Sequence, residues 1–279
     1  MGRCDGSQEG NRMLSSKGLL LFDYDGTLVD GSIGIHEISD ATVEALCQAR
    51  SNGYLTVLAS GRSIGMVEPV KHLFDGFITT NGAYAQIKGK EYHNRTIDKD
   101  VLRRMMEFFQ DKHDRIYANV ETQDYCYVTK MNSDLYERIM EYFGLDRSKF
   151  SQWEGQYDTD YNKLTVMYSD RAAFEELYQS FGEELEIIDH PLEDYAEIMP
   201  KGCTKGSALR AVMEKSGMPA DNIYAFGDSE NDYTMLQAAG HATIMGKHSP
   251  IVEEVADFVT LRVEEEGIPF ALKHYGIIE

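Results

Sequence analysis

Short apolar runs alternate with amphipathic stretches along most of the chain. Gly18 to Phe22 is apolar and is followed by a turn rich in Asp and Gly, a pattern typical of a buried strand in a parallel sheet. The sequence predicts further strands at Tyr54 to Ala59 and Gly76 to Thr80, and helices at Ser39 to Asn52 and around Met66 to Phe74. This βαβα order predicts a doubly wound, parallel α/β sheet.

The pattern changes between residues 84 and 196. Aromatic, strand-like segments lie at Tyr125 to Val128 and Lys163 to Tyr168, and helical segments alternate with them at about Asp98 to Lys112, Ser133 to Phe143 and Arg171 to Phe181. We interpret residues 84–196 as a separate α+β domain inserted into the α/β core. The core is then expected to comprise residues 17–83 and to resume near Glu197 to Met199, so that its second part is 197–279.

Acidic residues follow two of the apolar runs. Asp23 and Asp25 close the first run, and Asp228 and Asp232 follow the apolar run Ile223 to Phe226. The carboxyl ends of parallel strands form the edge where ligands bind in such sheets. Two acids spaced two residues apart in extended chain face the same way and repel each other, which favours a cation between them. We therefore expect a hard-cation site of the Mg²⁺ type with oxygen ligands, although a simple Asp/Gly turn would also explain the first cluster.

Two other segments carry groups suited to the same edge. Ser60, Gly61 and Arg62 end the second predicted strand with a hydroxyl, a glycine and a cation. Lys201 to Gly206 places lysines at a predicted loop-to-helix junction ahead of the second acidic cluster. Together, the two acidic clusters, the hydroxyl and the lysine form a far more specific pattern than any of them alone.

With these segments in this order, the chain resembles the haloacid dehalogenase (HAD) superfamily of phosphatases, and within it the Cof-like subfamily IIB. The resemblance rests on Asp23-Tyr24-Asp25-Gly26-Thr27, Ser60-Gly61-Arg62, Lys205-Gly206 and Gly227-Asp228-Ser229-Glu230-Asn231-Asp232, and it covers nearly everything from about residue 17 onward. It implies a HAD-like, Rossmann-like core with an inserted cap domain of the C2 type that selects the substrate. One segment departs from the subfamily pattern, because Met245-Gly246 is followed by Lys247-His248 instead of Asn-Ala.

The residue types are suited to phosphoryl transfer. Asp23 is ionised at neutral pH without help from a base and can act as a nucleophile, forming an aspartyl-phosphate. A Mg²⁺ ion and the ammonium of Lys205 would offset the negative charge of the phosphate. Asp25, one strand period away, would act as general acid and then as general base, a role that requires it to hold a proton in the first step.

The resemblance also implies a set of ligands. The metal would be bound by the carboxylates of Asp23 and Asp228 and by the main-chain carbonyl of Asp25, and Asp232 would orient a ligand or the lysine. The phosphate would be bound by Ser60, Gly61, Lys205 and Asn231. Ordinary structural roles stay open for three of these: Ser60 could simply end a strand, Lys205 could be an exposed lysine, and Asn231 could be a helix cap.

Composition agrees with a soluble enzyme. The chain has 279 residues, 27 basic and 47 acidic side chains and a formal net charge of −20, which argues against nucleic-acid and anionic-membrane partners. No run approaches the roughly 18 apolar residues of a membrane span. Residues 1–16 are polar without an apolar signal-peptide region, so we expect an unstructured tail or a cloning remnant, and a cytoplasmic protein.

The sequence therefore predicts a Mg²⁺-dependent phosphomonoester hydrolase that acts on a small soluble phosphometabolite, with a sugar phosphate as the expected substrate. Two alternatives stay open: a phosphomutase of the same fold, and a phosphometabolite-binding regulator with little turnover. An intact pair of Asp23 and Asp25 weighs against the regulator, since a pure binder has no need of an acid/base aspartate. The sequence leaves the oligomeric state open.

Overall fold

The computed structural model describes residues 16–142 and 145–279, and these fall into two compact units. One unit, the core domain, runs up to Gly61 and continues with Pro69–His93 and Thr204–Glu279. The other, the cap domain, comprises Arg62–Glu68 and Asn94–Cys203. The predicted tail, residues 1–16, lies outside the described residues except for Ser16.

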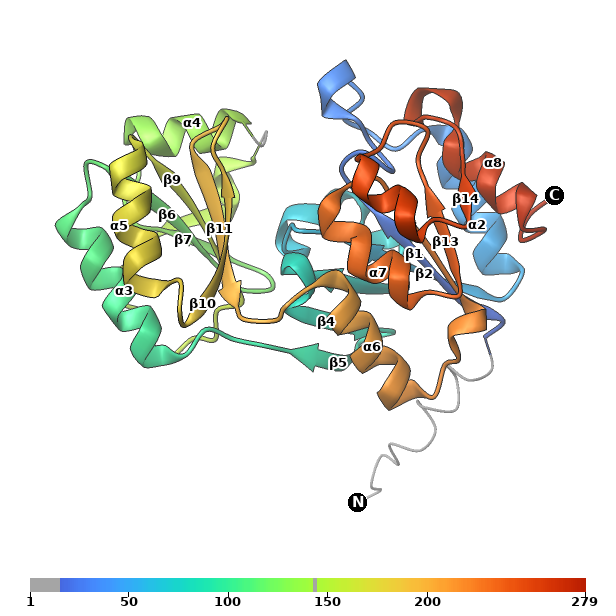
Figure 1. The fold of residues 1–279 in the computed structure, drawn as a ribbon, viewed down its shortest axis with the longest axis horizontal. Coiled ribbons are helices and arrows are strands. Elements are labelled where there is room, and N and C mark those ends of the chain that lie inside the picture. Colours follow the sequence, from blue (N-terminus) through green and yellow to red (C-terminus); the bar gives the residue numbers. More distant parts are fainter. Residues whose placement is uncertain (1–15, 143–144) are drawn as a thin grey trace. The chain divides into compact units, whose positions relative to one another are not determined.

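The core domain is built on one sheet with β1 near its middle (Figure 1). Parallel pairing runs from β14 to β3, and β4 then pairs antiparallel with β3. The strands, in spatial order, are β14 (Phe258–Val259), β13 (His241–Ile244), β12 (Ile223–Gly227), β1 (Gly18–Asp23), β2 (Tyr54–Ala59), β3 (Gly76–Thr79), β4 (Tyr84–Ile87) and β5 (Lys90–Asn94). The predicted doubly wound α/β fold is confirmed.

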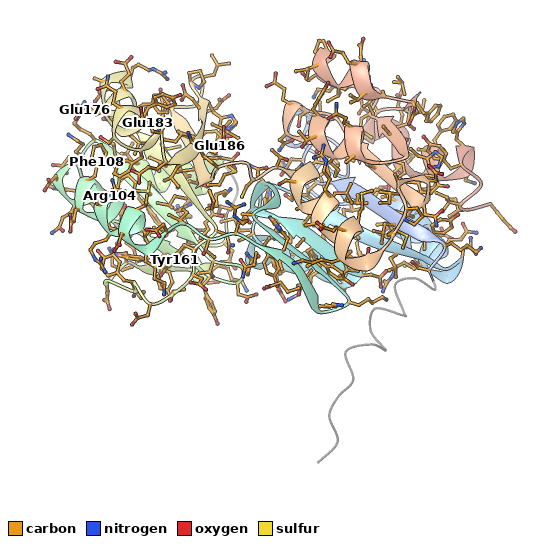
Figure 2. All side chains as sticks on the ribbon, turned by 60° about the horizontal axis from the view of Figure 1, so that its bottom comes forward. Arg104, Phe108, Tyr161, Glu176, Glu183 and Glu186 are labelled. Carbon is orange, nitrogen blue, oxygen red and sulfur yellow. The ribbon has the colours of Figure 1, made fainter. Side chains whose placement is uncertain are left out.

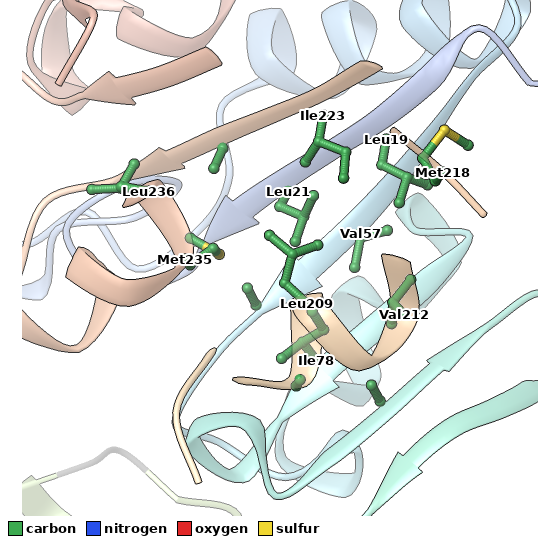
Figure 3. Packing of buried hydrophobic residues seen from close by; sticks show 14 of the residues in the cluster. Leu19, Leu21, Val57, Ile78, Leu209, Val212, Met218, Ile223, Met235 and Leu236 are labelled. Carbon is green, nitrogen blue, oxygen red and sulfur yellow. The ribbon is translucent and has the colours of Figure 1, made fainter. Parts of the chain in front are cut away.

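Alternating side chains of β1 bury the two faces of this sheet. Leu19 and Leu21 pack with Leu209 of α6 (Lys205–Ser216) and Met235 of α7 (Tyr233–Ala238) in one apolar cluster (Figure 3). Leu20 and Phe22 point to the opposite face because side chains alternate along a strand. Figure 1 shows α2 (Asp40–Ser51) and α8 (Gly267–His274), which contact each other, on that other side.

Most predicted core elements are present, with one change of type. The helix predicted at Ser39 to Asn52 is α2, and Ser39 caps it by accepting a hydrogen bond from the backbone of Thr42. The helix predicted around Met66 to Phe74 is instead a 3-10 helix at Ile64–Leu73, with non-helical backbone at Val67. Pro69 explains the difference, because proline has no N–H and its ring clashes with the preceding turn of an α-helix.

The cap domain is an α+β unit with its own sheet and its own apolar core, as predicted. Its six strands, in spatial order, are β10 (Leu185–His190), β11 (Tyr195–Pro200), β9 (Lys163–Tyr168), β6 (Ile116–Glu121), β7 (Cys126–Val128) and β8 (Phe150–Gln152). Helices α3 (Lys99–Asp111) and α5 (Arg171–Phe181) pack on the face that carries Val120 and Leu164. Helix α4 (Asp134–Tyr142) packs with Tyr117 and Met167, which belong to the opposite face.

Surface residues of α3 tie it to the end of α5. Arg104 and Phe108 project from α3 (Figure 2). Arg104 pairs with Glu184 at 2.6 Å, and the ring of Phe108 packs edge-on against Phe181 with ring centroids 5.6 Å apart. The three cap helices thus lie where the sequence predicts them.

The boundary between the domains differs from the predicted range 84–196. Residues of β4 form a hairpin with β3 and so extend the core sheet. Glu197 to Met199, predicted to resume the core, belong to β11, which pairs with β9 and β10 in the cap sheet. The cap therefore begins at Asn94 and ends at Cys203, apart from its short segment Arg62–Glu68.

Candidate active site

Two neighbouring strands deliver the acidic clusters to one edge of the core sheet. Phe22 of β1 pairs with Phe226 of β12, and their rings stack with centroids 4.7 Å apart. Asp23 follows Phe22, and Asp228 follows two positions after Phe226. The structure thus brings the two predicted acids together, with Asp23 buried and Asp228 half-buried.

Lys205 lies at the centre of the cluster. It is the first residue of α6, whose N-cap is Thr204, and its side chain has no solvent exposure. Its Nζ lies 2.5 Å from Asp23 Oδ1 and 2.7 Å from Asp232 Oδ1. Burial lowers the pKa of Lys205, but the two carboxylates outweigh burial and the net effect is a raised pKa. The lysine is therefore a fixed cation, and the alternative of an exposed lysine is excluded.

Asp232 has both carboxylate oxygens engaged by the protein. Its Oδ1 accepts from Lys205, and its Oδ2 accepts from the backbone amides of Asp228 and Ser229 at 3.0 and 3.1 Å. The side chain thus links the lysine to the loop that follows β12.

The carboxylates outnumber the cation that faces them. Burial, followed by repulsion from Asp232, raises the pKa of Asp23 well above its ordinary value, and Lys205 only partly opposes this. The same two causes raise the pKa of Asp228 to about 7. Oxygens of Asp23, Asp228 and Asp232 lie within 4.8 Å of one another.

One oxygen of this set has no protein partner. Asp23 Oδ2 is buried and accepts no hydrogen bond from any residue that the structure describes. Buried carboxylate oxygens held close together, with excess negative charge, are a donor set that suits a hard divalent cation. The residues present therefore fit a Mg²⁺ ion.

The loop after β1 is shaped around Asp228. Gly26 has a φ of +95°, and a Cβ at this position would lie 2.3 Å from Asp228 Oδ2, so only glycine fits. The hydroxyl of Thr27 donates to Asp228 Oδ1 at 3.2 Å. The exposed Asp25 lies on this loop. The contact made by Thr27 was not predicted, although Thr27 is part of the first motif.

The remaining predicted site residues lie around the same strand ends. Ser60 is buried and follows Ala59, which pairs with Asp23 in the sheet. The Oδ1 of Asn231 lies 3.5 Å from Lys205 Nζ. Arg62, in contrast, belongs to the cap domain.

A family model described as haloacid dehalogenase-like hydrolase matches residues 20–272. The chain belongs to this family. Membership in the HAD family accounts for the order of the four motifs, and it confirms the predicted class of enzyme, a phosphatase of this superfamily.

Named relatives resemble the chain over nearly its whole length. Phosphatase YwpJ of Bacillus subtilis (strain 168) is 27% identical over 292 residues, covering 92% of this chain and 99% of that protein. The 5-amino-6-(5-phospho-D-ribitylamino)uracil phosphatase YcsE of the same organism is 27% identical over 261 residues, covering 92% and 95%. The solved structure of BT4131, a sugar phosphatase of HAD subclass IIB, superposes with a TM-score of 0.76 at 26% identity, covering 94% of this chain and 100% of that one. The expected resemblance to subclass IIB is confirmed.

Lys247, which departs from the subfamily pattern, binds Asp30 Oδ2 at 2.8 Å and Ser32 Oγ at 2.7 Å, so its charge is directed at the loop that follows β1.

In the part of the chain that the structure describes, no helix is both long enough and apolar enough to cross a membrane.

Sequence reasoning missed one residue near the site. Asn81 Oδ1 accepts a hydrogen bond from Asn231 Nδ2 at 3.3 Å, whereas the sequence suggests only a turn at Asn81-Gly82. A signal was available, because this pair follows β3 at the same edge of the sheet where Ser60 follows β2.

Proposed function

We propose that this protein is a Mg²⁺-dependent phosphomonoester hydrolase that acts on a small soluble phosphometabolite through an aspartyl-phosphate at Asp23. The observation that carries the proposal is the buried contact between Asp23 and Lys205, 2.5 Å long, beside an Asp23 oxygen that has no partner among the described residues. A nucleophilic carboxylate next to a fixed ammonium is what attack on an anionic ester requires.

The carboxylates of Asp23 and Asp228 and the main-chain carbonyl of Asp25 would hold the ion. Asp232 would not bind the ion directly but would orient Lys205 and the loop after β12, since its oxygens accept from Lys205 and two backbone amides. When bound, Mg²⁺ offsets the charge of the phosphate and of the carboxylates and stabilises charge in the transition state.

Two aspartates carry the bond changes. A carboxylate oxygen of Asp23 attacks the phosphorus, an O–P bond forms, and the bond from phosphorus to the ester oxygen breaks. Asp25 gives its proton to that oxygen, so that the alcohol leaves neutral. In the second step Asp25 takes a proton from water as the water attacks the phosphorus, the Asp23–phosphorus bond breaks, and inorganic phosphate is released.

Four residues would hold the phosphate oxygens. The hydroxyl of Ser60, the backbone of Gly61, the ammonium of Lys205 and the amide of Asn231 supply donors from separate segments of the core domain. Donors that are already in place cost little reorganisation when charge develops, which is the main source of catalysis in such sites.

The cap domain would select the substrate. The resemblance to BT4131, a sugar phosphatase, supports a sugar phosphate, and the resemblance to YcsE supports a phosphorylated polyol chain as an alternative within the same class.

The test is phosphate release from sugar phosphates, nucleotides, pyridoxal phosphate and p-nitrophenyl phosphate, each with Mg²⁺ or EDTA. We expect Mg²⁺-dependent release that disappears in Asp23→Asn and persists in Asp100→Asn, a matched change at an exposed carboxylate of α3. Release that survives in Asp23→Asn, or no release from any compound in the wild type, would refute the proposal.

A further inference from the structure

The loop between β3 and β4 has three consecutive residues in the left-handed region of the backbone. The φ angles are +52° at Thr80, +52° at Asn81 and +87° at Gly82. Glycine adopts this conformation freely and asparagine tolerates it, but for a β-branched threonine it is a true outlier. Such strain persists only where the surroundings hold it in place, and it concentrates at functional sites.

Thr80 adds a second anomaly. Its side chain is completely buried, and its hydroxyl has no hydrogen-bond partner in the described parts of the chain. Neither the backbone conformation nor the hydroxyl is what local stability would favour. The conformation of this loop is therefore explained by its contacts with neighbouring segments and not by its own local stability.

The loop contacts two of the segments that form the proposed phosphate site. The backbone amide of Asn81 donates to the carbonyl of Ser60 at 3.2 Å, and a Cβ on Gly61 would lie 3.0 Å from Asn81 Oδ1. A Cβ on Gly82 would lie 2.0 Å from the carbonyl oxygen of Thr204, so the loop packs directly on the residue that caps α6.

The side chain of Asn81 reaches a third segment. Asn231 Nδ2 donates to Asn81 Oδ1 at 3.3 Å, while Asn231 Oδ1 accepts from Ser229 Oγ at 2.9 Å and lies 3.5 Å from Lys205 Nζ. A primary amide has two N–H donors in one plane with its oxygen. Asn81 therefore takes one donor of Asn231 and fixes the plane of the amide, which sets the direction of the second donor.

We propose that Asn81 is a positioning residue of the phosphate site, which acts through Asn231: its side chain fixes the Asn231 amide so that one N–H is directed at a phosphate oxygen and the carbonyl faces Lys205. The left-handed backbone of the loop is what brings this side chain between Gly61 and Asn231. The inference rests on the proposed function, because it presumes that Asn231 binds phosphate.

The test isolates the side chain from the backbone. Asn81→Gly removes the acceptor but keeps a residue that adopts a positive φ without strain. Asn132→Gly is the matched control, since Asn132 has a φ of +57° on the exposed surface of the cap domain. We expect Asn81→Gly to lower kcat/KM about three- to tenfold, the effect of one hydrogen bond, with a melting temperature close to that of the control.

A double-mutant cycle separates positioning from a structural role. If Asn81 acts through Asn231, Asn81→Gly has no further effect on kcat/KM in an Asn231→Ala background. The affinity for inorganic phosphate, measured by calorimetry in the presence of Mg²⁺ for the four proteins of the cycle, follows the same non-additive pattern. This second measurement does not depend on turnover.

Additive losses in the cycle, or an Asn81→Gly variant with unchanged kcat/KM and unchanged phosphate affinity, would overturn the proposal for Asn81. A wild-type protein that releases no phosphate from any ester but shows the non-additive binding pattern would refute the hydrolase and leave the positioning role supported. Failure of the inference and failure of the proposed function are thus distinguishable.

Discussion

The ammonium group of Lys205 lies 2.7 Å from the carboxylate of Asp232, and neither side chain is exposed to solvent. Taking both charges out of water is costly, and replacing such a pair by apolar residues is often neutral or stabilising in other proteins. Stability alone therefore gives little reason for this pair. The same ammonium also contacts Asp23, so Asp232 holds the Lys205 cation beside the proposed nucleophile.

We expect Lys205→Met to abolish phosphate release and to lower the free energy of unfolding by about 3–5 kcal/mol, because two buried carboxylates lose their cation. Urea denaturation measures the second effect. Lys215→Met, in the last turn of the same helix, is the control: Lys215 is an exposed residue whose ammonium donates to the carbonyl of Tyr92, so a loss of about 1 kcal/mol is expected. Equal unfolding midpoints for the two variants would contradict this account.

The acidic strand ends could be predicted from the sequence because their signals are local. An apolar run followed by acids and glycine identifies both β1 with Asp23 and β12 with Asp228, and the rules of parallel sheets place both ends on one edge. The identity of the edge was thus available without coordinates. The predicted roles of Asp25, Ser60 and Gly61 stay predictions until they are tested.

Two features could not be predicted because they depend on contacts between distant segments. Residues of β11 have a strand-like pattern, but that pattern does not say which sheet they join, and the domain boundary was therefore misplaced. Asn81 and Asn231 are 150 residues apart and meet only through the fold. An Asn-Gly pair is ordinarily explained as a turn, so its side chain attracted no functional interpretation.

The raised pKa of Asp228 predicts an unusual pH dependence for the metal-free protein. Its pKa is about 7 in the folded state, through burial and the charge of Asp232, against about 3.9 in an unfolded chain. Between these values the folded protein binds a proton that the unfolded chain lacks, so the contribution of Asp228 to stability falls as the pH rises through this window. Thermal unfolding in EDTA measures this slope, and we expect it to flatten in Asp228→Asn.

Binding of Mg²⁺ should stabilise the protein more as the pH rises, which is opposite to the trend expected for the metal-free protein. Metal binding requires ionised carboxylates, so Mg²⁺ competes with protons at Asp23 and Asp228. We expect the rise in melting temperature on adding MgCl₂ to be larger at about pH 8 than at about pH 5. A rise of equal size at both pH values would show that these carboxylates do not bind the metal.

Substitution of Lys247 is expected to affect the loop after β1 more than the stability of the whole protein. Its ammonium binds Asp30 and Ser32, and Asp30 also caps the short 3-10 helix at Gly31–Ile33. Since Lys247 is largely exposed, Lys247→Met should cost at most about 1 kcal/mol of global stability. We expect faster amide hydrogen exchange at residues 31–35 and a lower kcat/KM, because this loop continues from Asp25. Unchanged exchange in this segment would show that the contacts of Lys247 with Asp30 and Ser32 do not hold the loop in place.

The cap domain also contains a buried lysine, Lys163, whose ammonium lies near two carboxylates. Lys163 Nζ lies 2.8 Å from Glu197 Oε1 and 3.6 Å from Glu121 Oε1, and the lysine side chain is 5% exposed. Burial opposes ionisation of Glu197, but Lys163 and the neighbouring His190 together outweigh burial and hold the pKa of Glu197 at about 2. For Glu121 burial prevails over the lysine, and its pKa is raised.

These opposite shifts predict opposite outcomes for two variants of the cap. Lys163→Met leaves the buried Glu121 without a cation and Glu197 with His190 alone, and it should destabilise the domain by about 3–5 kcal/mol. Glu121→Gln removes the carboxylate with the raised pKa and keeps an oxygen that can accept from Thr165, whose hydroxyl lies 2.6 Å from Glu121 Oε1, so little loss or a gain is expected. Hydrogen exchange in β6 and β9 measures both effects where they arise. Equal protection in the two variants would mean that Lys163 does not balance this pair of charges.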